Sequence, residues 1–243
     1  MISHPLKNKI KASFNQAWAS YDDHALLQKK ICTELVNLLK FNTKIYDHIA
    51  DIACGTGIST EALITACQPS TLYAIDFSEQ LLQRAQRKLI HSNTQFMLAD
   101  FDEIFLPKHT LDLMFSSMGL QWSLNLKETL HHLHSFIQPR GSLAFAIPVD
   151  GTFPELHSTS KNILHRASSL ESILAATGFK HHSITTQTYI ESFTSQKEAL
   201  YSIKNIGAHC KLNQTKTQSL NPYINPDRTT LTYEICFVIA QVQ

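Results

Sequence analysis

The fold is decided by the stretch Ile49-Ala50-Asp51-Ile52-Ala53-Cys54-Gly55-Thr56-Gly57, which a helical segment joins to Thr71-Leu72-Tyr73-Ala74-Ile75-Asp76. Two apolar runs each carry an acid at their end, and a glycine-bearing turn follows the first run. Gly55 and Gly57 let the backbone turn sharply and let a ligand approach it closely. The helix that begins near Ile58 directs free N–H groups and the positive end of its dipole at that ligand. The stretch therefore predicts a βαβ unit with a ligand site at the carboxyl ends of its strands.

The second acid indicates what kind of ligand this is. Asp76 lies 19 residues after Gly57, which places it at the tip of the neighbouring parallel strand. A carboxylate there can accept hydrogen bonds from both hydroxyls of a ribose. A nicotinamide site would need Gly-x-Gly-x-x-Gly, but position 60 is Thr60. An ordinary βαβ crossover with a tight turn is the alternative that involves no ligand.

The unit resembles the S-adenosylmethionine (SAM) binding motif of class I methyltransferases, which usually reads Asp-x-Gly-x-Gly-x-Gly. Ala53 stands where the first glycine is usual, and its methyl group predicts some crowding without excluding binding. The resemblance implies a set of cofactor-binding residues in and after the two strands. They are Asp51, Ala53, Cys54, Gly55, Gly57, Asp76 and Phe77.

The rest of the chain continues the alternation of strands and helices. We expect strands at 46–53, 71–76, 94–99, 111–116, 142–148, 181–193 and 230–242, and helices at 58–67, 78–89, 126–136, 169–177 and 195–209. Residues 5–40 predict a helical hairpin, whose second helix would be capped by Asp22-Asp23 and would bury an apolar stripe. The predicted class is α/β: a Rossmann-like class I methyltransferase fold with a seven-stranded, mostly parallel sheet and helices on both faces.

The 243 residues suit one methyltransferase domain, and the 43% apolar fraction is enough for a sizeable core. Within it we expect an N-terminal helical lid over residues 1–40 and a SAM-binding core over 41–150. A C-terminal substrate-side half would cover 151–243, with a lid insertion at about 195–225 before the last strand.

Further candidate residues follow the other strands and the N-terminal helices. Asp100 can accept from the adenine amine, and Phe101 can line the ring. Ser117, Gln121 and Trp122 follow the fourth strand, and a sulfonium near the Trp122 face would gain about 0.5–2 kcal/mol of cation–π stabilisation. Tyr21 lies at the hinge of the hairpin and can reach a ligand from there.

Composition excludes several classes of protein. The net charge of +1, from 21 basic and 20 acidic residues, argues against nucleic acid as the main partner. The sequence predicts a cytoplasmic protein without membrane association. It has five cysteines without a CxxC pair, a polar N-terminus, and no apolar run that approaches the length of about 20 residues needed to span a membrane. The trio His131, His132 and His134 lacks a neighbouring carboxylate, so we expect no metal. We expect a monomer.

Segments outside the nucleotide-binding unit resemble one family, the malonyl-[acyl-carrier-protein] O-methyltransferases of biotin synthesis. The segments are Phe14-Asn15-Gln16-Ala17, Ala19-Ser20-Tyr21-Asp22, His24-Ala25-x-Leu27-Gln28, Leu120-Gln121-Trp122, Pro154-Glu155-Leu156-His157, Ser202-Ile203-Lys204-Asn205-Ile206-Gly207-Ala208 and Leu231-Thr232-Tyr233-Glu234. They span nearly the whole chain. The departures are Ala53 and a polar region around residues 211–226.

The resemblance implies transfer of a methyl group from SAM to the free carboxylate of a malonyl thioester on acyl carrier protein, leaving S-adenosyl-L-homocysteine. The ester would then serve as a masked primer for extension toward pimeloyl. Tyr21 would act catalytically by closing over the reacting methyl, and Gln121 and Trp122 would contact the substrate. A cation or donor should hold the substrate carboxylate, with His157, Arg166 and Lys204 as candidates.

Two other functions fit the same motif. One is a SAM-dependent methyltransferase that acts on a free small molecule, such as a quinone precursor or a small organic acid. The other is a binding module that kept the fold and lost the chemistry. The second is disfavoured because Asp51, Gly55, Gly57, Asp76 and Asp100 occur together.

Overall fold

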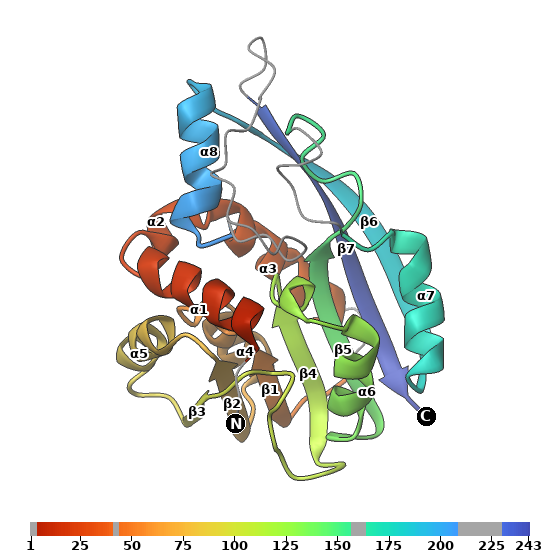
Figure 1. Ribbon diagram of the computed structural model, residues 1–243. Coiled ribbons are helices and arrows are strands. Elements are labelled where there is room, and N and C mark those ends of the chain that lie inside the picture. Colours follow the sequence, from red (N-terminus) through yellow and green to blue (C-terminus); the bar gives the residue numbers. More distant parts are fainter. Residues whose placement is uncertain (1–3, 41–43, 157–163, 209–229) are drawn as a thin grey trace.

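A seven-stranded sheet forms the centre of the computed structural model, which describes residues 4–40, 44–156, 164–208 and 230–243 (Figure 1). The strands are β1 His48–Ile52, β2 Thr71–Asp76, β3 Thr94–Leu98, β4 Leu111–Ser117, β5 Ile137–Pro148, β6 Phe179–Ser192 and β7 Thr230–Val242. Their order in the sheet is β3-β2-β1-β4-β5-β7-β6. The first five strands pair in parallel, and β7 is antiparallel to both of its neighbours. This confirms the predicted mostly parallel sheet.

Helices cover both faces of the sheet. They are α1 Pro5–Ala17, α2 Tyr21–His24, α3 Leu26–Lys40, α4 Ile58–Cys67, α5 Glu79–Lys88, α6 Leu126–His134, α7 Ala167–Ala176 and α8 Gln196–Asn205, with a short 3-10 turn η1 at Leu120–Trp122. Side chains alternate along β1, so that Ile49 joins the apolar cluster of α3 and α4 while Ala50 and Ile52 join the cluster of α6 and α7. Figure 1 shows α6 and α7 at one end of the molecule and α1, α2 and α5 grouped at the other.

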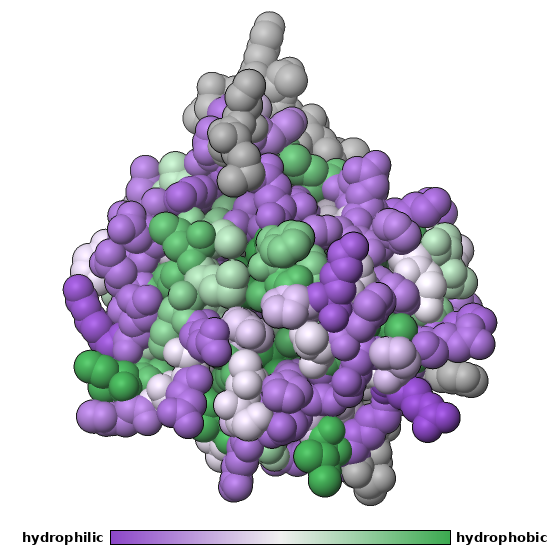
Figure 2. All heavy atoms as spheres, turned by 90° about the horizontal axis from the view of Figure 1, so that it is seen from below, coloured by the Kyte–Doolittle hydropathy of each residue, from purple (hydrophilic) through white to green (hydrophobic). Residues whose placement is uncertain are grey.

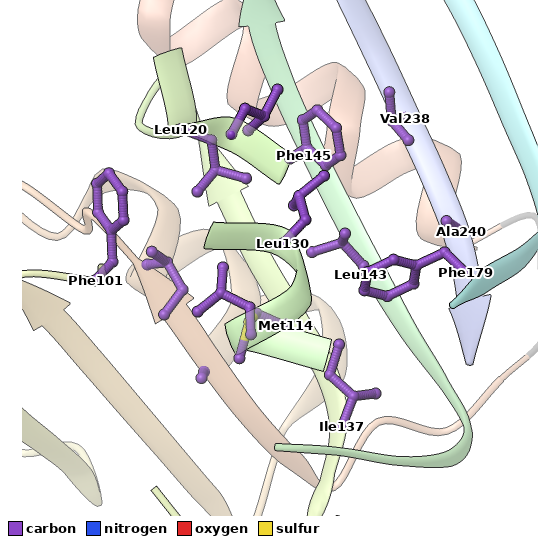
Figure 3. Close-up of a cluster of buried hydrophobic side chains, with 14 of the residues drawn as sticks. Phe101, Met114, Leu120, Leu130, Ile137, Leu143, Phe145, Phe179, Val238 and Ala240 are labelled. Atoms are coloured by element: carbon purple, nitrogen blue, oxygen red, sulfur yellow. The ribbon is translucent and has the colours of Figure 1, made fainter. Parts of the chain in front are cut away.

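The face under α6 holds the core seen in Figure 3. Phe145 of β5 and Phe179 of β6 are fully buried there, next to Leu130 of α6. Each large apolar side chain buried in this way stabilises the fold by about 1.5–3 kcal/mol. This core includes side chains of β4 and β5, and the loop after β4 is one of the segments expected at the site.

The N-terminal region differs from the predicted hairpin because it contains three helices. The expected cap at Asp22-Asp23 is wrong: α2 begins at Tyr21, with Ser20 at its N-cap, and both acids lie in its first turn. The carboxylate of Asp22 is held by Thr56 and Arg84 instead, so it is not free to cap a helix. The next helix, α3, begins at Leu26, which is 67% exposed, so the buried stripe of this helix begins only at Leu27.

The start of β5 also differs from the prediction. The strand begins at Ile137 rather than Ser142, and α6 ends at His134 rather than at residue 136. Residues 139–141, which precede the predicted strand, lie inside β5, where the register with β4 shifts. Gly141 fits this close approach, because a Cβ there would lie 2.5 Å from a methyl carbon of Ile137.

The surface is largely polar. Figure 2 shows a mostly hydrophilic face, interrupted by a group of hydrophobic residues near its centre. In the part of the chain that the structure describes, no helix has the length and apolar character needed to span a bilayer.

Candidate functional site

Asp76 ends β2 and braces the glycine turn. Its Oδ2 accepts from the backbone N–H of Gly55 at 2.8 Å, and its Oδ1 accepts from the N–H of Ser78 at 2.7 Å. The side chain is buried, and this burial raises its pKa to about 6 in spite of the donated hydrogen bonds. The residue therefore has a second role that the sequence pattern did not predict: it fixes the turn that any ligand must approach.

Asp51 of β1 is a buried carboxylate with one oxygen unpaired. The hydroxyls of Ser59 and Thr60, in the first turn of α4, donate to its Oδ2 at 2.7 and 2.6 Å. Its Oδ1 is buried and has no hydrogen-bond partner. Burial raises the pKa of this carboxyl to about 7. A donor-rich cation would satisfy the free oxygen and compensate the buried charge.

The turn between β1 and α4 is open toward a ligand at Gly55. A Cβ built on this residue would have nothing within 4 Å, and its φ of 57° is one that favours glycine. Ala53 also has a positive φ of 57°. Its methyl group points at Gly119, where a Cβ would lie only 2.6 Å away. The missing side chain at Gly119 thus leaves room for the Ala53 methyl group within the chain, and the crowding of a ligand by Ala53 stays a prediction.

The residues after β3 are covered by α1. Lys7 is only 4% exposed, and its Nζ lies 2.9 Å from Asp100 Oδ1 and 2.8 Å from Asp102 Oδ2. The same ammonium lies 4.2 Å from the centroid of the Phe101 ring. The adenine-binding roles of Asp100 and Phe101 stay predictions. Lys7 was not predicted from the sequence, because a lone lysine 93 residues from its partner forms no local pattern.

The short helix α2 is latched onto the turn through Asp22. Thr56 Oγ1 donates to Asp22 Oδ1 at 2.5 Å, and Arg84 Nη2 of α5 lies 3.0 Å from Asp22 Oδ2. Lys29 Nζ donates to the backbone carbonyl of Asp22 at 2.8 Å. These contacts hold the N-terminal helices against the carboxyl edge of the sheet, and the lid role of residues 1–40 stays a prediction.

Tyr21 begins α2 at the centre of this arrangement. Its phenol lies near the carboxylates of Asp76 and Asp22 and the thiol of Cys32. Burial and these neighbouring charges raise its pKa well above the usual value of a phenol, so it keeps its proton. Tyr21 can therefore donate a hydrogen bond at the site and cannot act as a base near neutral pH.

We expect Tyr21→Phe to lower kcat by about tenfold while leaving the melting temperature within a degree or two. The change removes one hydroxyl donor and keeps the ring, and one hydrogen bond is worth about 0.5–1.5 kcal/mol. Steady-state kinetics and thermal unfolding of the two proteins give the comparison. Unchanged kcat would mean that Tyr21 only packs the lid.

Three candidate residues lie at and after the end of β4, and each has different contacts. Ser117 ends β4 beside the Cys32 thiol. The amide nitrogen of Gln121 donates to Met118 O at 2.7 Å, while its Oε1 is buried without a partner. Trp122 is 6% exposed and packs edge-on against Phe14 of α1, with ring centroids 5.5 Å apart. Trp122 thus anchors α1, and its predicted contact with substrate stays a prediction.

Of the three candidates for holding the substrate carboxylate, the two that the structure describes are exposed and lie on different helices. The side chain of Arg166, at the N-cap of α7, is 81% exposed and lies 3.9 Å from Asp150 Oδ2. Lys204 is exposed in the last turn of α8, with Nζ 5.8 Å from the Tyr201 ring centroid. His157 lies outside the described residues. No cluster of three or more metal-binding side chains occurs where the structure describes the chain.

The chain is similar in sequence to known methyltransferases. Residues 49–141 match the family model described as a methyltransferase domain. The malonyl-[acyl-carrier protein] O-methyltransferase 2 of Coxiella burnetii is 43% identical, over 99% of this chain and 98% of that protein. The Bacillus cereus malonyl-[acyl-carrier protein] O-methyltransferase is 33% identical over 83% and 81% of the two chains.

Solved structures show the same fold at low sequence identity. The phosphoethanolamine N-methyltransferase 2 of Haemonchus contortus, in complex with S-adenosyl-L-methionine, superposes with a TM-score of 0.62 at 15% identity, over 94% of this chain and 57% of that one. Asp51 and Asp76 border an open glycine turn, and the chain aligns with the Coxiella protein over nearly the full length of both. The chain belongs to the malonyl-[acyl-carrier protein] O-methyltransferase family, with the class I fold of SAM-dependent methyltransferases.

Proposed function

We propose that this protein methylates the free carboxylate of malonyl-acyl carrier protein with SAM, giving the malonyl methyl ester that primes pimeloyl synthesis for biotin. The observation that carries the proposal is the pair Asp51 and Asp76 on either side of an open glycine turn, under a lid formed by α1 and α2. Family membership supports the choice of substrate.

The free polar atoms of the site fit SAM. Asp51 Oδ1 lacks a donor and would take the ammonium of the methionine end. The carboxylate of Asp76 accepts backbone hydrogen bonds from Gly55, Phe77 and Ser78, and its two oxygens offer about four acceptor sites in all, which leaves capacity for a ribose hydroxyl. Gly55 leaves room for close approach, and Asp100 and Phe101 would meet the adenine. When bound, SAM supplies an activated methyl group.

Carboxyl methylation depends more on positioning of the reacting groups than on proton transfer. A malonyl carboxylate is already ionised at pH 7, because carboxyl groups titrate near about 4. The chain therefore needs no general base. Its residues have to align the carboxylate and exclude water, and such positioning can supply up to about 7–11 kcal/mol. The latch of Asp22 and the buried Tyr21 phenol would close the site for this purpose.

The domain arrangement follows from this role. We propose one methyltransferase domain in which residues 1–40 cover the cofactor and residues 151–243 supply the substrate side. Asn205 of α8 contacts His24 at 3.1 Å, and its carbonyl accepts from Ser20 Oγ at 3.1 Å. The C-terminal half thus touches the lid at its hinge. A metal-free monomer acting in the cytoplasm is the form that we propose.

Incubation with methyl-labelled SAM tests the function directly. The label should enter malonyl-acyl carrier protein and be released by mild base as methanol, as a methyl ester requires. Malonyl-CoA should react more slowly and free malonate least. Labelling of a quinone precursor or a free organic acid, with none on the carrier protein, would replace this function with small-molecule methylation.

We further propose that Lys204, Lys211 and Arg166 contribute to docking of the carrier protein, which is acidic. Lys211 lies outside the described residues, whereas Lys204 and Arg166 are exposed. Charge reversal at these three positions should raise KM for malonyl-acyl carrier protein severalfold and flatten its salt dependence, because rim charges act on association. Lys108→Glu, an exposed residue before β4, is the control.

SAM affinity and slow turnover of malonyl-CoA should not change in the docking variants. Equal losses on both substrates would place these residues in the active site itself. Unchanged kinetics on both would show that the carrier docks elsewhere.

A further inference from the structure

Gln28 of α3 is a buried polar residue without an explanation in the fold. It is 8% exposed and lies among apolar neighbours on the inner side of its helix, where Leu27, Ile31 and Leu35 are also buried. Its Oε1 is fully buried and accepts no hydrogen bond. Leaving a buried carbonyl unpaired costs about 1–3 kcal/mol, so a residue of this kind calls for a partner absent from the protein chain itself.

The position of Gln28 relates it to the cofactor edge of the sheet. Cys32 lies one helical turn further along α3, on the same side of the helix. The thiol of Cys32 lies near Asp51, Ser117 and Tyr21. Gln28 is one turn closer to α2, and its neighbour Lys29 donates to the Asp22 carbonyl in the lid latch. Helical spacing therefore places Gln28 one turn from a thiol that borders the carboxyl ends of β1 and β4, on the α2 side of it.

The side chain of Asp51 lies on the face of the sheet that α3 covers. Side chains alternate along the strand, and Ile49, two residues earlier, packs in the cluster that α3 covers. Asp51 Oδ1, like Gln28 Oε1, is buried without a donor. Two buried acceptors thus occur on the α3 side of the site. An ammonium carries three N–H donors and can satisfy both acceptors together, whereas a carboxylate can satisfy neither.

We propose that Gln28 is a cofactor-positioning residue whose carboxamide, together with Asp51, binds the amino-acid end of SAM. This proposal rests on the proposed function only in assuming SAM as the cofactor. A neutral carboxamide suits the place, because it accepts from the ammonium and can donate to the adjacent α-carboxylate without adding charge. Gln28 would hold the methionine arm and so fix the direction in which the sulfonium presents its methyl group.

The test compares ligands that do and do not carry the amino-acid end. Gln28→Met keeps the length of the side chain and removes its polar atoms. By calorimetry this variant should bind S-adenosylhomocysteine about tenfold or more weakly than the wild type. It should bind methylthioadenosine, which lacks the amino-acid end, with unchanged affinity. The exposed Gln80→Met of α5 is the matched control and should change neither.

Thermal unfolding without ligand separates this role from a structural one. Gln28→Met should melt at or above the wild-type temperature, because the unpaired carbonyl is gone. Equal weakening of both ligands, or no weakening of either, would overturn the proposal. Normal S-adenosylhomocysteine binding with a raised KM for the malonyl substrate would also overturn it, by assigning Gln28 to the substrate. Calorimetry requires no turnover, so failure of the proposed reaction would leave the result interpretable.

Discussion

Replacement of Asp76 by alanine is expected to weaken binding of S-adenosylhomocysteine by more than about a hundredfold. The carboxylate would accept two ribose hydroxyls, and hydrogen bonds to a charged group contribute about 1.5–3 kcal/mol each. The same oxygens already accept from Gly55 and Ser78 and fix the glycine turn. The change therefore removes ligand contacts and loosens the turn at once. Titration calorimetry measures the affinity, and activity should fall in parallel at low SAM.

Methylthioadenosine should lose affinity in Asp76→Ala as well, because it carries the same ribose. Asp76→Asn keeps one acceptor oxygen and should show a smaller loss. Asp23→Ala, at an exposed acid of α2, serves as the control for removing a carboxylate near the site. Wild-type affinity in Asp76→Ala would refute the ribose assignment and leave the residue with only its role in the turn.

Binding of S-adenosylhomocysteine is expected to weaken about ten- to twentyfold as the pH falls from 8 to 6. Asp51 has a pKa of about 7 in the free protein, and only its ionised form pairs with the ligand ammonium. A group that must lose one proton before binding changes affinity about tenfold per pH unit below its pKa. Asp76, with a pKa of about 6, adds about a further twofold over this range. Calorimetry at a series of pH values gives the slope.

The stability of the free protein should change with pH in the opposite direction. Both acids have pKa values raised above the unfolded value of 3.8, so the folded form holds their protons more tightly. Their contribution to stability is complete below about pH 4 and is lost as the pH rises through 6 to 7. The melting temperature without ligand should fall over that range, while the increase produced by ligand should grow.

Asp51→Asn should reduce the pH dependence of binding to the small part that comes from Asp76. It should also weaken binding at pH 8, where the wild-type carboxylate is ionised. The free variant should be at least as stable as the wild type at pH 8, because a buried charge has been removed. A variant with the full wild-type slope would show that another group titrates.

Local patterns account for what the sequence predicted correctly. The acids Asp51 and Asp76 and the turn glycines lie within one βαβ unit, so their spacing alone places them at one edge of the sheet. The N-cap at Ser78 was predictable for the same reason, and its Oγ accepts from the Leu81 N–H at 3.4 Å. Apolar residues that recur every three or four positions likewise predict the buried faces of the helices.

Contacts between distant segments account for what was missed. Lys7 reaches Asp100, and Arg84 reaches Asp22, only after α1 and α2 have docked on the core. The burial of Trp122 depends on Phe14 in the same way. A signal was available for Gln28, because a glutamine at a buried position of an apolar stripe is unusual.

The pairing of Ala53 with Gly119 has a consequence for recognising related sequences. A Cβ at position 119 would lie 2.6 Å from the Ala53 methyl group, 66 residues earlier in the chain, and 2.7 Å from Ser116 Oγ. A search that scores the glycine motif alone would count Ala53 as a defect of the nucleotide site. Because these side chains share one space, we expect relatives with a small side chain at position 119 to have glycine at position 53 and a residue smaller than serine at position 116. Co-variation across an alignment, rather than either residue alone, is then the mark of an intact site.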